Sequence, residues 1–413
     1  MTQSNSQYKE EMSMRIKYIL IAAICLLAVS IAFTAADVQK ITPTAKVFSY
    51  YHLNLSAIDA SEVFSDRESK FDFSRIYAGV KYQLSDDFMA EYLTDAGRQD
   101  KTGQLELFTK YAYLDWKLGF LGAHLSMGLQ GTYNWKQPEK MWGCRGIQYA
   151  PMESFHKYFG KVDDDYIDLL ESEAETLLDT SDGNVPSGSD IRRAAELATQ
   201  AANFESAKYS GMGASADIGV ALNLKPTKEF YLDVMVRNGG GYKNAENDFF
   251  KNIQMRTGYY LLDKALHISG YFELEPYKGY DNEIEKTVFN NIQWDAAVSY
   301  EKKDLFTAGL NVNSKIFSGS YENITAMCVS GFGHVFIKKK VKALARYDHY
   351  ITGINGTKAV SDAPKTNAGL IIAGLDYIPL KGVNIIPNVQ IWTYEDEGKD
   401  KDVNFYVHLL YSY

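Results

Sequence analysis

Residues 405–413 end the chain with the sequence FYVHLLYSY, in which every second side chain is aromatic or aliphatic. Phe405, Val407, Leu409, Tyr411 and Tyr413 share one face if this stretch is a strand, because successive side chains of a strand point to opposite sides. A buried last strand of a soluble protein would show the same alternation. The rest of the chain must therefore decide whether this face meets lipid or a protein core.

The same period of two dominates the chain from residue 41 onward. It is clearest from Met212 to Leu224, where apolar or small residues alternate with mostly polar or very small ones. The length of most segments is typical of tilted membrane strands, which need about 9–11 residues to cross a bilayer. We predict sixteen strands, at residues 43–53, 72–84, 88–95, 105–117, 121–133, 210–224, 230–238, 250–260, 265–274, 290–300, 305–316, 323–336, 341–350, 366–377, 383–394 and 402–413.

The connections between these strands alternate in length. Short polar turns such as 85–87 and 338–340 follow the even strands, whereas longer links such as 239–249 and 351–365 follow the odd strands. Short turns on one rim and long loops on the other are typical of outer-membrane barrels, and a soluble β-sandwich has no reason to keep this order. The fold class predicted is therefore all-β, a closed antiparallel transmembrane β-barrel of about sixteen strands whose last strand pairs with the first.

Composition and charge agree with a barrel that has a polar interior. Aromatic residues make up 14% of the chain, with 30 Tyr, and the mean hydropathy is only −0.27. Tyrosine suits a membrane interface because its ring is apolar and its hydroxyl reaches water. The net charge of −9 argues against a nucleic-acid partner.

The N-terminal residues are typical of a secretory signal. Arg15 and Lys17 precede an apolar run at 18–33, and small residues at 34–36 offer a cleavage site. The run is shorter than the roughly 20 residues of a spanning helix, which disfavours the alternative of a membrane anchor. We expect residues 1–36 to be a signal peptide, 37–413 to form the barrel, and the mature protein to reside among outer-membrane lipids.

The longest connection, residues 134–209, departs from the period of two and follows the fifth predicted strand. Its helical spacing predicts two short helices joined by a turn. We expect Lys161 to Phe204 to fold into the lumen as an acidic constriction, with an exposed acidic lobe as the alternative. The acidic residues proposed for the pore loop are Asp163, Asp164, Asp165, Asp168, Glu171, Glu173 and Glu175.

Basic residues on the predicted strands are expected to line the pore. A charge that faces lipid at the bilayer midplane costs about 2–4 kcal/mol, so the lumen is the default position for such a side chain. The parity of the fourth strand is ambiguous at Lys110. The predicted pore-lining residues are Arg75, Lys81, Lys110, Arg237, Arg256, Lys342 and Arg346.

Signals for an enzyme or a metal protein are weak. The seven His residues are scattered, and neither an HExxH nor a GxSxG motif occurs. The acidic cluster lacks the spacing of an EF-hand, and Cys144 and Cys328 form neither a metal motif nor a disulfide framework. We therefore assign no catalytic residue, metal or cofactor. An outer-membrane hydrolase and a barrel for surface binding or adhesion remain as alternative functions.

At the level of architecture the whole mature length resembles Gram-negative porins, whose third long loop, after strand five, constricts the lumen. The terminal strand also resembles the assembly signal of outer-membrane barrels. Residues 142–145 (WGCR) and 238–244 (NGGGYKN), with Arg256, look like strings of the phosphate-selective porins. The acidic net charge departs from that group, so phosphate selectivity is not carried over. The resemblance implies a homotrimer and passive diffusion of ions and small hydrophilic solutes.

Overall fold

A computed structural model of the chain describes residues 41–56, 69–98, 104–153, 168, 171–180, 185–210, 214–243, 246, 249–280, 286–318, 322–356, 367–395 and 401–413. The predicted signal peptide at residues 1–36 lies outside this part of the chain and stays a prediction. Within the described residues, no helix is both long and apolar enough to cross a bilayer.

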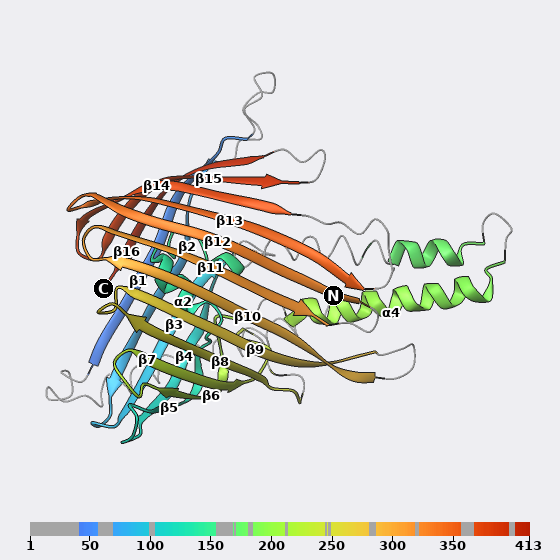
Figure 1. Cartoon of the computed structure of the whole chain (residues 1–413), viewed down its shortest axis with the longest axis horizontal. Coiled ribbons are helices and arrows are strands. Elements are labelled where there is room, and N and C mark those ends of the chain that lie inside the picture. Colours follow the sequence, from blue (N-terminus) through green and yellow to red (C-terminus); the bar gives the residue numbers. More distant parts are fainter. Residues whose placement is uncertain are drawn as a thin grey trace, which may run out of the picture.

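Sixteen antiparallel strands form one closed barrel in which each strand pairs with its neighbours in sequence (Figure 1). The predicted fold class and strand number are confirmed. The strands are β1 Ile41–Asn54, β2 Ser69–Gln83, β3 Phe88–Arg98, β4 Leu105–Lys117, β5 His124–Gly131, β6 Ala216–Leu224, β7 Phe230–Arg237, β8 Asn252–Leu261, β9 Leu266–Tyr280, β10 Lys286–Lys302, β11 Phe306–Phe317, β12 Glu322–Lys338, β13 Val341–Gly356, β14 Ala368–Leu380, β15 Val383–Tyr394 and β16 Asp402–Ser412.

The barrel is closed by the first and last strands. β1 pairs with β16 from Lys46 opposite Ser412 to Asn54 opposite Asn404. This confirms the expected closure and leaves neither strand with an unpaired edge. Closure matters in lipid because each unsatisfied backbone polar group there costs several kcal/mol.

The two faces of the strands are reversed relative to a soluble protein. On β8, Ile253 and Met255 are exposed on the outside, whereas Gln254 and Arg256 between them are buried on the inside. Leu409 and Tyr411 of the terminal strand are exposed in the same way. Apolar side chains outside and polar side chains inside are the pattern of a strand between lipid and a polar lumen.

The turns keep the order that the sequence predicts. Residues 84–87, 118–123, 225–229, 262–265, 303–305, 339–340 and 381–382 make short turns on one rim, and the longer links lie on the other. The tightest turn needs Gly382, with φ of 84°, because a β-carbon there would lie 2.3 Å from the carbonyl oxygen of Ser412. Because Gly382 has no side chain, the end of β16 lies against the turn, where the N–H of Ser412 donates to the carbonyl oxygen of Gly382 over 2.8 Å.

Several strand boundaries differ from the prediction; β9 extends to Tyr280 and β13 to Gly356, each six residues beyond the predicted end. β6 begins at Ala216 rather than at residue 210, because Ser210 is the last residue of helix α4 (Gly188–Ser210). β5 is shorter at both ends than the predicted 121–133, since residues 118–123 form a turn and the chain leaves the sheet after Gly131. Alternation alone could not reveal these ends.

A β-bulge in β4 resolves the ambiguous parity at Lys110. Leu93 of β3 pairs with Tyr111, but the next residue, Thr94, pairs with Thr109. Lys110 is thus the extra residue of the bulge, and both Lys110 and Tyr111 face the interior.

Candidate functional site

The segment that follows β5, residues 132–153, lies inside the barrel. At one end the hydroxyl of Tyr133 donates a hydrogen bond to Asn223 Oδ1 of β6 over 2.8 Å. At the other end Arg346 of β13 donates to the carbonyl oxygen of Tyr149 over 2.6 Å. The side chain of Gln148 also donates to Gln390 Oε1 of β15 over 2.9 Å. The segment therefore crosses the lumen between opposite walls.

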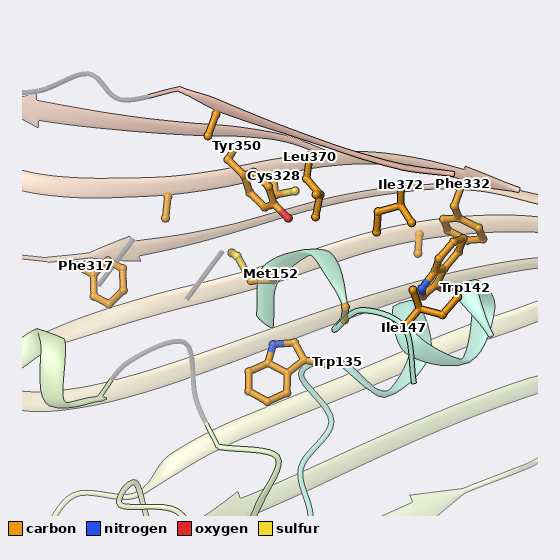
Figure 2. Close-up of a cluster of buried hydrophobic side chains, with 14 of the residues drawn as sticks. Trp135, Trp142, Ile147, Met152, Phe317, Cys328, Phe332, Tyr350, Leu370 and Ile372 are labelled. Carbon is orange, nitrogen blue, oxygen red and sulfur yellow. The ribbon is translucent and has the colours of Figure 1, made fainter. Parts of the chain in front are cut away.

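An apolar cluster fixes this inserted segment to one wall. Trp142 is 1% exposed and packs edge-on against Phe332 of β12, with ring centroids 5.9 Å apart (Figure 2). The inward faces of β12, β13, β14 and β15 are unusually apolar for a lumen, and they supply the other side of the contact. The cluster includes Met141, Cys144, Ile147 and Met152 of the segment, and Ala326, Cys328, Leu344, Tyr350, Leu370, Ile372 and Ile386 of the wall.

The short helix α2 (Lys136–Trp142) divides the lumen into a packed side and an open side. Gln137, Pro138, Met141 and Trp142 are its buried residues. Lys136 and Lys140 are exposed on the other face, as expected for positions four apart on a helix. The helix ends at Gly143, whose φ of 71° gives the left-handed cap that returns its N–H to the carbonyl oxygen of Glu139.

A cavity of about 630 Å³ lies on the open side of α2. Its other walls come from the first strands, β1 to β4, and from β16. The polar lining consists mainly of charged side chains: Lys46, Lys81, Glu91, Lys110, Lys136, Glu139, Lys140, Arg145 and Glu153. Phe48, Tyr77, Tyr111, Trp135 and Leu410 are among its apolar and aromatic lining residues.

The carboxylates of this cavity are all engaged. Glu91 lies 3.2 Å from Lys81 Nζ, while Glu139 and Glu153 both pair with Arg145, at 3.4 and 3.1 Å. Lys46, Lys136 and Lys140 have no carboxylate within 4.0 Å among the residues that the structure describes. The cavity thus presents excess positive charge although the chain is acidic overall.

Lys136 is open to the cavity but is surrounded by the barrel wall. This enclosure, together with the guanidinium of Arg256, lowers the pKa of Lys136 to about 8. Cys144 lies on the packed side, where burial raises the pKa of its thiol to about 12. Cys144 and Cys328 are unbonded, and no cluster of metal-ligating side chains occurs in the described part of the chain.

The seven predicted basic residues lie on the inner surface, each beside a wall carboxylate. Most carboxylates sit on an adjacent strand, and Asp348 shares β13 with its partner. Removing one member of a buried ion pair costs about 3–5 kcal/mol. This applies to the buried pairs of Arg237, Arg256 and Arg346, whereas Lys81 is 46% exposed and its pair with Glu91 contributes less. The pairs are Arg75–Asp95, Lys81–Glu91, Lys110–Asp95, Arg237–Asp217, Arg237–Glu273, Arg256–Asp233, Lys342–Asp376 and Arg346–Asp348.

Four of these seven residues border the cavity or the inserted segment. Lys81 and Lys110 line the cavity. Arg256 stacks on Tyr133, with 4.6 Å from its guanidinium carbon to the ring centroid, and Arg346 lies over Trp142 at 5.5 Å. The inserted segment therefore covers these two arginines, which are part of its attachment to the wall.

The structure does not place the acidic segment where the sequence led us to expect it. Figure 1 shows the helix at 171–178 and the N-terminal half of α4 beyond the strand ends, on the rim with the long links. Asp168, Glu171 and Glu175 are exposed there, and Glu173 is half-buried. Asp163, Asp164 and Asp165 lie outside the described residues.

The apolar face of α4 is partly buried together with the barrel wall. Ala174 of the first helix and Ala194, Leu197 and Ala201 of α4 belong to the same buried cluster as the wall residues Ala297 and Phe317. Part of the face of α4 that was expected to pack on a wall is therefore buried in this cluster, whereas Ile191 is 54% exposed. Arg75, Arg256 and Arg346, the expected partners of its carboxylates, pair instead with Asp95, Asp233 and Asp348. Among the described residues, 132–153 cross the lumen, whereas 171–178 and the N-terminal half of α4 lie beyond the strand ends.

Neutralising the lobe should leave conduction unchanged. We expect the quadruple variant Asp168→Asn, Glu171→Gln, Glu173→Gln and Glu175→Gln to keep the single-channel conductance and reversal potential of the parent protein, because exposed charges beyond the rim are screened over about 10 Å at 0.1 M salt. The measurement is planar-bilayer recording in a salt gradient. A shift toward anions would show that the lobe lies in the current path after all.

Sequence comparisons give no family assignment. No protein-family model matches the chain, and no curated protein matches it.

Solved structures are similar over nearly the whole barrel. The outer-membrane channel DcaP of Acinetobacter baumannii has a TM-score of 0.56 at 11% identity, covering 90% of this chain and 97% of its own. An anion-selective porin from Comamonas acidovorans has a TM-score of 0.56 at 10% identity, covering 90% and 99%. The trimer form of OmpT from Vibrio cholerae has a TM-score of 0.53 at 12% identity, covering 90% and 99%. The fold is the porin fold.

Within this porin fold, three cavity residues on the inserted segment were not predicted from the sequence. Lys136, Lys140 and Arg145 of the inserted segment were not singled out, because the segment is short and has no period over several turns. The string WGCR, residues 142–145, was the available signal. It contains both the anchor Trp142 and the cavity residue Arg145.

Proposed function

We propose that the protein is an outer-membrane porin that passes ions and small hydrophilic solutes by passive diffusion. The observation that carries this proposal is the charged cavity beside the inserted segment, within a closed barrel whose outer face is apolar. A polar passage shaped by one fixed internal segment needs neither an energy source nor a catalytic group. In this proposal residues 1–36 direct export and are cleaved before Asp37, and the barrels associate as a homotrimer.

The proposal is tested by conductance of the refolded, purified chain in planar bilayers. We expect stepwise currents of uniform size, and swelling of proteoliposomes in small sugars but not in large ones. Protein denatured before addition is the control. A correctly folded barrel that inserts without current would overturn the proposal, and it would favour a surface-binding role for the projecting lobe of 171–178 and α4. Crosslinking in detergent tests the trimer.

Ion selectivity should depend on pH through Lys136. This side chain is charged below its pKa of about 8 and loses its charge above it, so the positive charge of the cavity falls as pH rises. We expect the ratio of anion to cation permeability to fall between pH 7 and pH 9. The charged groups around Lys136 are Arg256, Asp233, Lys81 and Glu91. The variant Lys136→Gln should lose this step, and a step of equal size in the variant would assign it elsewhere.

A further inference from the structure

We infer that the cavity favours small organic anions with an aromatic or aliphatic body, such as aromatic carboxylates, over inorganic ions and organic cations. This inference rests on the proposed function and names the substrate class of that passage. Two features carry it. The first is the set of ammonium groups at Lys46, Lys136 and Lys140 that have no carboxylate partner among the described residues, with Lys140 Nζ donating to the hydroxyl oxygen of Tyr260 over 3.5 Å. The second is the group of apolar side chains beside them.

The charges make the cavity attractive to anions. The three carboxylates of the lining are held by Lys81 and Arg145, which leaves the three lysines without an ionic partner among the described residues. They come from different elements, since Lys46 lies on β1 and the other two on α2. Their ammonium groups therefore border the cavity from more than one side. A cleft lined by one sign of charge between low-dielectric walls concentrates ions of the opposite sign.

The remaining lining combines neutral polar residues, such as Thr44, Asn134 and Ser215, with several apolar side chains. Phe48 and Tyr77 meet edge-to-face with centroids 5.9 Å apart. Leu410 stands opposite Phe48 in the β1–β16 pairing, and Tyr111 and Trp135 line the same cavity. An inorganic anion would gain nothing from these side chains, whereas an aryl or alkyl group would bury apolar surface against them at about 25 cal/mol per Å².

The size of the space fits a single small molecule. A cavity of about 630 Å³ lies within the range of about 300–1,000 Å³ that holds small ligands in proteins. It can accept a carboxylate that carries one ring.

The test uses the refolded full-length protein in planar bilayers with KCl. We expect a reversal potential that reports chloride as several-fold more permeant than potassium. Benzoate added to one side should reduce the chloride current at concentrations at which acetate, phosphate and benzylammonium do not. Acetate and phosphate are anions without a ring, so they test the contribution of the ring. Benzylammonium carries the ring with a positive charge, so it tests the contribution of the negative charge.

Two sets of variants separate the features. The triple variant Lys46→Gln, Lys136→Gln and Lys140→Gln should lose most of the chloride preference and the benzoate block. Its matched control is Lys228→Gln, Lys264→Gln and Lys303→Gln, which removes the same charge from exposed turns on the rim. Phe48→Ala should weaken the benzoate block several-fold, and Val47→Ala, the neighbouring change on β1, should not.

The outcomes are distinct. A conducting channel that prefers potassium, or that is blocked equally by benzoate and acetate, would overturn this inference while leaving the porin proposal intact. An equal loss of chloride preference in the rim control would also overturn it, because the charge would then act at a distance from the cavity. Absence of any channel current would refute the proposed function and the inference together.

Discussion

Truncation of the chain after Asn404 should abolish assembly of the barrel. Removal of residues 405–413 leaves β1 and β15 without their shared partner, because β16 pairs with both strands along most of its length. Two strand edges would then face lipid, where each unpaired polar group costs several kcal/mol. β1 and β15 run in the same direction, so they could close the gap only by forming a parallel pair, whereas all neighbouring strands of this barrel pair antiparallel.

The measurement is folding into detergent micelles and liposomes, read by heat-modifiable mobility on gels and by protease resistance. The matched control replaces residues 171–179, also nine positions, with a Gly–Ser linker in the projecting lobe. We expect this control to fold. Normal folding and insertion of the truncated chain would contradict the closure of the barrel by β16.

Replacement of residues 135–152 by a short Gly–Ser linker should raise the single-channel conductance several-fold. This segment crosses the lumen and fills the side next to β12–β15, so its loss joins the cavity to the space that the cluster now occupies. Thermal stability should fall because the apolar inner faces of those strands become exposed to water. The barrel should persist, because its strand pairing does not depend on the segment.

A point variant keeps this prediction testable if the replacement folds poorly. Trp142→Ala removes the most buried anchor of the segment, at a cost of about 3–5 kcal/mol by analogy with buried aromatic residues. We expect a looser segment and noisier, larger currents. The linker in place of residues 171–179 again serves as the control and should leave the current unchanged. Unaltered conductance after loss of residues 135–152 would place the constriction elsewhere in the barrel.

The architecture could be predicted from the sequence because it depends on local patterns. Alternation along each strand, as at Ile253 to Arg256, reports which face meets lipid, and the order of short and long connections reports the two rims. The terminal residues from Phe405 to Tyr413 add the last strand. Each of these inferences uses only residues that are close in sequence, within one strand or in the connection between two consecutive strands.

The interior could not be predicted, because its contacts join distant residues. Asp95 holds Arg75 and Lys110 from the two strands beside its own and also accepts a hydrogen bond from Tyr242, which lies 147 positions further along the chain. Strand parity showed that the basic residues point inward, but only the register shows that carboxylates meet them there.

The long loop misled the sequence analysis for a physical reason. Acidic helices are conspicuous in a sequence, and the helical spacing near Ile191 suggested a face that needed a wall. The structure buries Ala174, Ala194 and Leu197 in the same cluster as the wall residues Ala297 and Phe317, and leaves Ile191 exposed. The segment that fills the lumen has the short helix α2 and helical residues at 151–153, and in the sequence its anchors appear only as isolated tryptophans.

The two faces of α2 also bear on how this protein can change over evolutionary time. Met141 and Trp142 hold the helix in place, whereas Lys136 and Lys140 on the opposite face touch no part of the packed cluster. Substitutions at the two lysines can therefore accumulate with little penalty in stability. Under the porin function proposed above, the charge of the cavity can therefore change by substitutions at two positions of α2, while Met141 and Trp142 keep the helix in place.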